Sequence, residues 1–335
     1  MKREPSVPAG TVQRLWIDSE VLTSNMLGDP SRRIIDVYVP HGHDGRSLPL
    51  LVDIVGFTAG GPAHTNWKSF GENMPERLDR LIAEGMKPVV VAFPDCFTKL
   101  GGNQYINSVA MGRWADFLLQ EAVPFIEARL NCGGTGRRGL FGKSSGGYGA
   151  IAHALLYPDF WSGAACHSGD MGFEWAYLPE MPSLLRALKP HNNDIKSWLA
   201  EFFSKKKTNE KDIHTLMNFA MCATYDPDPN AYMGVRLPVD LDTCEIIPER
   251  WNNFMAWDPV VMAETRGAGL KKLKALYVDC GDIDQYNLLY GARRLHRLLQ
   301  RMDVTHTYEE FSDNHSSVDY RMDTSLPFLA KALSS

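Results

Sequence analysis

A serine set between closely spaced glycines is the most informative feature of this sequence. Residues 142–146 read Gly-Lys-Ser-Ser-Gly, so Ser144 satisfies the pattern Gly-x-Ser-x-Gly. An apolar stretch runs straight into this pattern, and the helix-forming stretch Ala150-Ile151-Ala152 follows it. A tight turn from a strand into a helix is the setting in which a serine hydroxyl is exposed as a nucleophile. The pattern therefore predicts that Ser144 attacks a carbonyl carbon.

The neighbouring Ser145 is the alternative nucleophile, but it lacks a glycine two residues before it. At the start of the following helix, its backbone N–H would point toward the negative charge that develops on a carbonyl oxygen. We therefore expect Ser145 to contribute one donor of an oxyanion hole. A glycine-rich turn with two incidental serines is the structural alternative to both roles.

A serine hydroxyl becomes reactive when a histidine accepts its proton and a carboxylate orients that histidine. With this turn, the three groups follow one another as serine, acid and histidine. Three aspartates compete for the acid at the end of the predicted strand 273–279. Asp279 belongs to the strand and Asp282 directly follows a glycine, whereas Asp284 lies in the loop proper and is favoured.

The histidine is expected in the loop after the last predicted strand, 304–311, where His315 lies. Between Asp284 and His315 there is room for one helix and one strand. The other histidines fit the role less well. His306 is expected within the strand and His153 in the helix after Ser144, while His167 and His64 remain candidates for the pocket wall.

A second oxyanion donor should come from the loop after the predicted strand 48–55. Gly56 would let this loop turn sharply, and the backbone N–H of Phe57 is the favoured donor, with Thr58 as the alternative. Substrate contacts are expected from four residues near the predicted site. These are Gly56, Trp175, Tyr177 and Tyr286, although an isolated aromatic residue is more often ordinary packing.

Short apolar runs alternate with helical patterns along the chain, which indicates a mainly parallel sheet flanked by helices. The predicted strands are 34–39, 48–55, 88–93, 138–141, 162–167, 273–279 and 304–311. Helices are predicted over 114–130, 195–203, 212–221 and 288–302. With the strand-turn-helix around Ser144, this alternation predicts the α/β-hydrolase fold. The long interval after the strand 162–167, which would be the sixth strand of this fold, predicts a cap over 169–260, between core segments 1–168 and 261–335.

The composition is that of an ordinary globular enzyme, with 44% hydrophobic and 22% charged residues among 335. A net charge of −5 argues against nucleic-acid binding. The six cysteines show neither a CxxC pair nor metal-ligand spacing, so no metal or other cofactor is expected. Without a signal peptide or a membrane-spanning apolar window, a cytoplasmic location and no membrane partner are expected. The sequence is compatible with a homodimer.

These residues together resemble the putative-esterase (esterase D-like) family, which includes S-formylglutathione hydrolases, feruloyl and acetyl xylan esterases, enterochelin esterases and mycolyltransferases. The matching segments are Ile34-Ile35-Asp36-Val37-Tyr38-Val39-Pro40, Leu48-Pro49-Leu50-Leu51-Val52, Gly56-Phe57, Gly102-Asn103-Gln104-Tyr105-Ile106-Asn107-Ser108, residues 142–146, Gly281 with Asp284, and His315. The resemblance implies metal-free hydrolysis of carboxylic esters, with Ser144 as nucleophile, Asp284 as acid and His315 as base.

The chain departs from that family in three places. Val55-Gly56 stands where many relatives have His-Gly, and Lys143 stands where histidine is common. The interval from 169 to 260 matches no subfamily. We therefore predict a carboxylic ester hydrolase acting on a small-molecule ester through an acyl-enzyme, without assigning the substrate. The alternatives are an acyltransferase on the same fold and a catalytically inactive binding protein.

Overall fold

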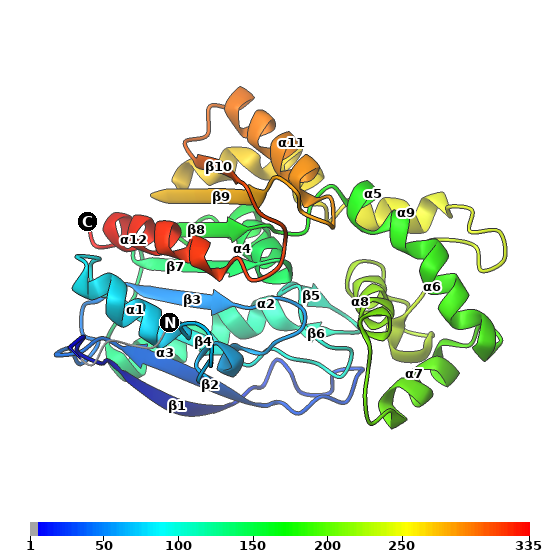
Figure 1. Cartoon of the computed structure of the whole chain (residues 1–335), viewed down its shortest axis with the longest axis horizontal. Coiled ribbons are helices and arrows are strands. Elements are labelled where there is room, and N and C mark those ends of the chain that lie inside the picture. The colour runs from blue at the N-terminus through cyan, green and yellow to red at the C-terminus, as the bar shows by residue number, and fades with distance from the viewer. Residues whose placement is uncertain (1–5) are drawn as a thin grey trace.

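The computed structural model describes residues 6–335 and is built around an eight-stranded sheet (Figure 1). The strand order is β1-β2-β4-β3-β7-β8-β9-β10. β1 and β2 pair antiparallel, and every pair from β4 to β10 is parallel. The strands are β1 (Thr11–Asp18), β2 (Arg32–Val39), β3 (Leu50–Ile54), β4 (Val90–Pro94), β7 (Arg138–Lys143), β8 (Gly163–His167), β9 (Ala275–Gly281) and β10 (Thr307–Phe311).

Both faces of the sheet are covered by helices, which explains why its central strands β3, β4 and β8 are buried on both sides. In β3, Leu50 and Val52 face one hydrophobic core and Leu51 faces the other, as the period of two in a strand requires. The first core holds α4 (Ser145–Leu156) and α11 (Leu288–Arg301). The second is formed with α1 (Met74–Ala83) and α12 (Met322–Leu333).

All seven predicted strands are present, with ends displaced by a few residues. The sequence missed β1, an edge strand whose side chains are mostly exposed, and the short hairpin of β5 (Asn107–Ser108) and β6 (Gly112–Arg113). His306 lies just before β10 rather than within it. The predicted helix 114–130 consists of α2 (Trp114–Asp116), a π-helical turn and α3 (Val123–Leu130). None of the helices within residues 6–335 is long and apolar enough to cross a membrane.

The interval between β8 and β9 forms a helical lobe beyond one end of the sheet (Figure 1). Its helices are α5 (Phe173–Ala176), α6 (Met181–Leu188), α7 (Ile195–Ser204), α8 (Glu210–Tyr225) and α9 (Pro248–Met255). The chain then returns through α10 (Pro259–Arg266), which packs on α4 and α11. The lobe therefore stands over the loops that follow the parallel strands. The division of the chain at 169 and 260 stays a prediction.

Candidate active site

Ser144 occupies a strained turn between β7 and α4. Its backbone has φ 58° and ψ −124°, a region that a non-glycine residue enters only at a cost of about 1–3 kcal/mol. A Cβ at Gly142 or at Gly146 would overlap the carbonyl oxygen of Ile54, so glycine is required on both sides of the turn. The neighbouring strand β3 thus passes directly beneath the turn and leaves room for no side chain there.

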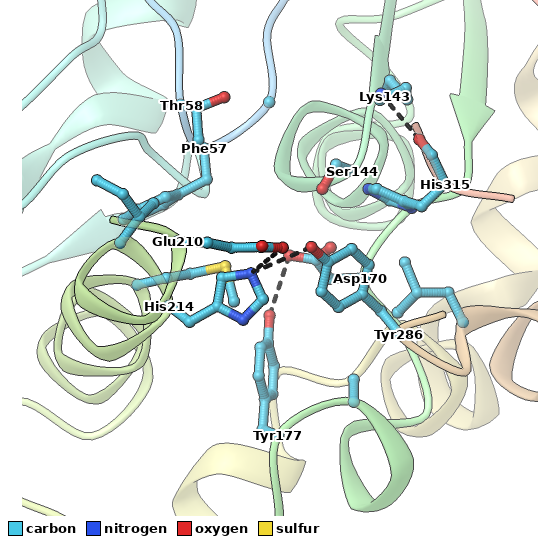
Figure 2. A pocket seen from close by; sticks show the side chains of 15 residues that line it. Phe57, Thr58, Lys143, Ser144, Asp170, Tyr177, Glu210, His214, Tyr286 and His315 are labelled. Carbon is cyan, nitrogen blue, oxygen red and sulfur yellow. Dashed lines mark hydrogen bonds and ion pairs between the residues drawn. The ribbon is translucent and has the colours of Figure 1, made fainter. Parts of the chain in front are cut away.

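Asp284 and His315 are joined by a hydrogen bond of 2.8 Å between Asp284 Oδ2 and His315 Nδ1. The Asp284 side chain is fully buried and that of His315 is 9% exposed. Because Nδ1 donates to the carboxylate, Nε2 is the ring atom left to accept a proton. The His315 imidazole and the Ser144 hydroxyl face one another across the site (Figure 2).

The two rival aspartates lie elsewhere. Asp279 Oδ1 bonds His167 Nδ1 at 2.8 Å and its Oδ2 accepts from Arg321, so this carboxylate is committed to another buried network. Asp282 is exposed and accepts a hydrogen bond from the Ser312 hydroxyl. Of the three candidates, only Asp284 contacts His315.

Backbone hydrogen-bond donors are available beside the Ser144 hydroxyl. A Cβ built on Gly56 would lie 3.6 Å from Ser144 Cβ, so the loop carrying Phe57 approaches Ser144 closely. Within residues 6–335, neither the Phe57 nor the Ser145 N–H has a hydrogen-bond partner. Both are therefore free to receive a carbonyl oxygen. Thr58 lies in the same loop and also lines the cavity, so the choice of Phe57 over Thr58 as the donor stays a prediction.

Ser144 and His315 line a cavity of about 340 Å³ between the sheet and the lobe (Figure 2). Gly56, Tyr177 and Tyr286 also line it, and their contact with a substrate stays a prediction. Trp175 does not line it: its side chain is 52% exposed and faces a separate surface depression with Tyr290. Because α5 is a helix, consecutive side chains point in different directions, and Trp175 does not share the cavity with Tyr177. The complete lining is Gly56, Phe57, Thr58, Lys143, Ser144, Asp170, Ala176, Tyr177, Glu210, Ile213, His214, Met217, Tyr286, Leu288 and His315.

Two other histidines considered for the pocket wall are absent from this lining. His167 is buried between Asp279 and the Ser325 hydroxyl, which lies 2.8 Å from its Nε2. His64 bonds the fully buried Asp53, with 2.7 Å between His64 Nδ1 and Asp53 Oδ2. Both imidazoles therefore serve buried polar networks rather than the cavity.

Sequence reasoning missed Asp170, which lies in the loop after β8 and is 7% exposed. Its Oδ2 accepts hydrogen bonds from Gln104 Nε2 (3.2 Å), the Ser145 hydroxyl (3.4 Å) and the Tyr177 hydroxyl (3.0 Å). Burial raises the pKa of Asp170, and these contacts together with the charge of His315 offset only part of that effect. An acid directly after a buried strand was the signal that could have found it.

Lys143 and the lobe helix α8 complete the wall. Lys143 Nζ donates to the backbone carbonyl of His315 at 3.0 Å, and burial lowers the pKa of this lysine. From α8, His214 Nε2 lies 3.2 Å from the Tyr286 hydroxyl. Lys143 thus anchors the loop that carries His315. Nothing in the sequence indicated that side chains of α8 line the cavity, because only the folding of the lobe brings this helix over it.

Comparison with known proteins agrees with this architecture. The model of the putative esterase family matches residues 24–324. A search of curated proteins found no significant match. A solved ferulic acid esterase superposes with a TM-score of 0.63 at 19% identity, covering 97% of this chain and 99% of that one.

Two S-formylglutathione hydrolases are also similar in structure. The enzyme from Agrobacterium tumefaciens has a TM-score of 0.58 at 16% identity, with 99% of each chain covered. The enzyme from Staphylococcus aureus has a TM-score of 0.56 at 13% identity, covering 97% of this chain and 99% of that one.

The mainly parallel sheet, its flanking helices and these superpositions define the fold as that of the α/β-hydrolases, as the sequence predicted. Within this class the family match identifies a serine hydrolase of the carboxylesterase type. The chain belongs to the putative esterase family, whose model spans most of its length.

Proposed function

We propose that the protein hydrolyses small carboxylic esters through a Ser144–His315–Asp284 triad and an acyl-enzyme intermediate. One observation carries the assignment of roles. The buried Asp284–His315 hydrogen bond of 2.8 Å ends at the cavity that Ser144 also lines, from a turn with φ 58°. The mechanism further requires that the His315 ring accept the serine proton at its Nε2.

In the first half of the reaction, His315 removes the proton of the Ser144 hydroxyl as its Oγ attacks the ester carbonyl. The resulting oxyanion accepts hydrogen bonds from the Phe57 and Ser145 N–H groups, each contributing on the order of 3 kcal/mol to lowering the barrier. His315 then protonates the leaving alcohol, and the acyl group remains on Ser144.

In the second half, a water molecule replaces the alcohol. His315 takes a proton from the water as it attacks the acyl carbonyl, and then returns that proton to Ser144 Oγ as the acid leaves. Asp284 keeps its negative charge throughout and stabilises the imidazolium that forms twice per turnover. If another alcohol replaced the water, the same groups would carry out acyl transfer.

The test is covalent labelling with a fluorophosphonate probe, together with turnover of p-nitrophenyl acetate. Ser144→Ala should abolish both while leaving the circular dichroism spectrum unchanged. Ser145→Ala keeps its backbone N–H and should still be labelled. Labelling that persists in Ser144→Ala would refute the assignment, and a wild-type protein that is never labelled would favour the binding-only alternative.

The substrate can be narrowed with a panel of acetyl, longer acyl and feruloyl esters together with the thioester S-formylglutathione. Ferulic acid esterases and S-formylglutathione hydrolases are the structurally similar enzymes, so both chemistries belong in the panel. Adding a competing alcohol and measuring the ratio of new ester to free acid separates hydrolysis from acyl transfer.

A further inference from the structure

The buried carboxylate of Asp170 opens onto the catalytic cavity without a cationic partner. Within residues 6–335, this side chain forms no ion pair with a lysine or arginine, and its hydrogen-bond donors are neutral groups. All three donors bond Oδ2. Oδ1 accepts no hydrogen bond from the described residues and is not sealed off from solvent. One oxygen of a buried carboxylate is therefore left for whatever occupies the cavity.

Lys143 also lines the cavity but does not neutralise Asp170. Its Nζ bonds the carbonyl of His315, and the acidic groups that act on its charge are Asp319 and Asp284. In Figure 2, Lys143 lies on the far side of Ser144 and His315 from the Asp170 carboxylate. The cavity is thus polarised, with a cation behind the base and an anion on the opposite wall.

Other groups on that wall also suit a positive charge. The rings of Phe57, Tyr177 and Tyr286 line the cavity, and aromatic faces attract cations. Glu210 lies at the mouth with its side chain 86% exposed. The negative charge of Asp170 near the oxyanion disfavours the transition state, because the two like charges repel each other. A cation bound between Asp170 and the oxyanion relieves that repulsion.

We propose that Asp170 is a specificity-determining residue that selects esters carrying an ammonium group. The proposal rests on the proposed function, since the same Ser144 would attack such a substrate. The ammonium group would lie against Asp170 Oδ1 and the aromatic rings, with the ester carbonyl at Ser144. Acidic substrates would be disfavoured by the same carboxylate.

The test compares cationic esters with neutral esters of the same shape. On the alcohol side, acetylcholine is paired with neohexyl acetate, in which carbon replaces the quaternary nitrogen. On the acyl side, the p-nitrophenyl ester of trimethylammonio-butyrate is paired with its tert-butyl carbon analogue. For at least one pair, kcat/KM should favour the cation by about tenfold or more.

Asp170→Asn should bring that ratio to about one, because the amide keeps the shape and removes the charge. The ratio is measured within one variant, so it does not depend on the fraction of active protein. Asp282→Asn is the matched control: this aspartate is exposed and does not line the cavity, so its ratio should stay near that of wild type. A ratio near one in wild type for both pairs, or one that survives Asp170→Asn, overturns the proposal.

If Asp170→Asn does not fold, a measurement on the wild-type protein alone still tests the proposal. Choline and neohexanol are compared as competitive inhibitors of p-nitrophenyl acetate hydrolysis, and choline should bind about tenfold more tightly. Equal inhibition overturns the proposal. Ser144-dependent hydrolysis without a preference for cations refutes only the role of Asp170, whereas activity that persists in Ser144→Ala refutes the proposed function itself.

Discussion

Tyr286 lies edge-on against the imidazole of His315, with ring centroids 4.8 Å apart and ring planes at 84°. The Tyr286 hydroxyl lies 3.2 Å from His214 Nε2 on α8. One side chain thus touches the proposed base and connects it to the helical lobe. This contact couples the position of the lobe helix to the orientation of the imidazole.

Variants at Tyr286 should separate these two contacts. Tyr286→Phe keeps the ring against His315 and loses only the bond to His214, so kcat/KM for p-nitrophenyl acetate should fall less than about fivefold. Tyr286→Ala removes the ring as well, and a loss greater than about tenfold is expected. Equal losses in the two variants would show that the ring contact with His315 contributes nothing.

The carboxylate of Asp284 should be essential for turnover but not for folding. Asp284→Asn would stabilise the wrong tautomer of His315, and kcat should fall on the order of 10⁴-fold. Asp282→Asn is the matched control: it is two residues away and exposed, and it should keep full activity. Steady-state kinetics on a p-nitrophenyl ester measures both. A larger loss at 282 than at 284 would reverse the assignment of the acid.

Gly102 should control the geometry of the predicted oxyanion loop. A Cβ at this position would overlap the backbone of Phe57, so Gly102→Ala must displace the Phe57 N–H. Loss of one oxyanion donor lowers kcat on the order of 10²-fold, with less effect on KM. Gly71→Ala, where an added Cβ meets no atom within 4 Å, is the control. Unchanged kcat in a folded Gly102→Ala protein would argue against Phe57 as a donor.

The buried His153 should make the fold sensitive to acid. Its Nε2 bonds the Tyr105 carbonyl at 2.7 Å and its Nδ1 accepts from the Trp161 indole at 3.1 Å, and burial lowers the pKa of His153 from 6.5 to about 4. Between these values the unfolded chain binds a proton that the folded chain does not. The free energy of unfolding should therefore fall by about 3 kcal/mol as the pH drops through this window.

His153→Gln removes the titrating group, so this variant should lose correspondingly less stability between pH 6.5 and 4. At higher pH it should be less stable than wild type, because the buried hydrogen bonds are imperfectly replaced. His43→Gln, at an exposed loop position, should leave the pH dependence unchanged. Urea unfolding across this pH range measures all three proteins. Parallel curves for wild type and His153→Gln would contradict the expectation.

Much of the core was predictable because its signals are local. Most of the parallel strands are short apolar runs, and the three proposed catalytic side chains lie just after parallel strands. Parallel strands end at the same edge of a sheet, so residues following different strands are brought together. This reasoning located Ser144, Asp284 and His315 before any coordinates. It failed for β1, whose exposed side chains carry no apolar run.

The lobe limited prediction of the pocket. Trp175 and Tyr177 were equally plausible from the sequence, yet only Tyr177 lines the cavity. The direction in which a short helix presents its side chains depends on how that helix packs, which local periodicity does not specify. For the same reason, His214 and Glu210 on α8 could not be assigned to the site.

The order of residues along the chain was enough to predict the parallel strands, the tight turn at Ser144 and the two loops in which an acid and a histidine were expected. These features depend on strand periodicity and on glycines that no other residue can replace beside Ile54. Only the tertiary structure decided which aspartate meets His315 and that Asp170 lines the cavity with no lysine or arginine paired to it among residues 6–335. Both depend on contacts between segments far apart in sequence, whose distances and burial arise only when the lobe and the sheet pack together.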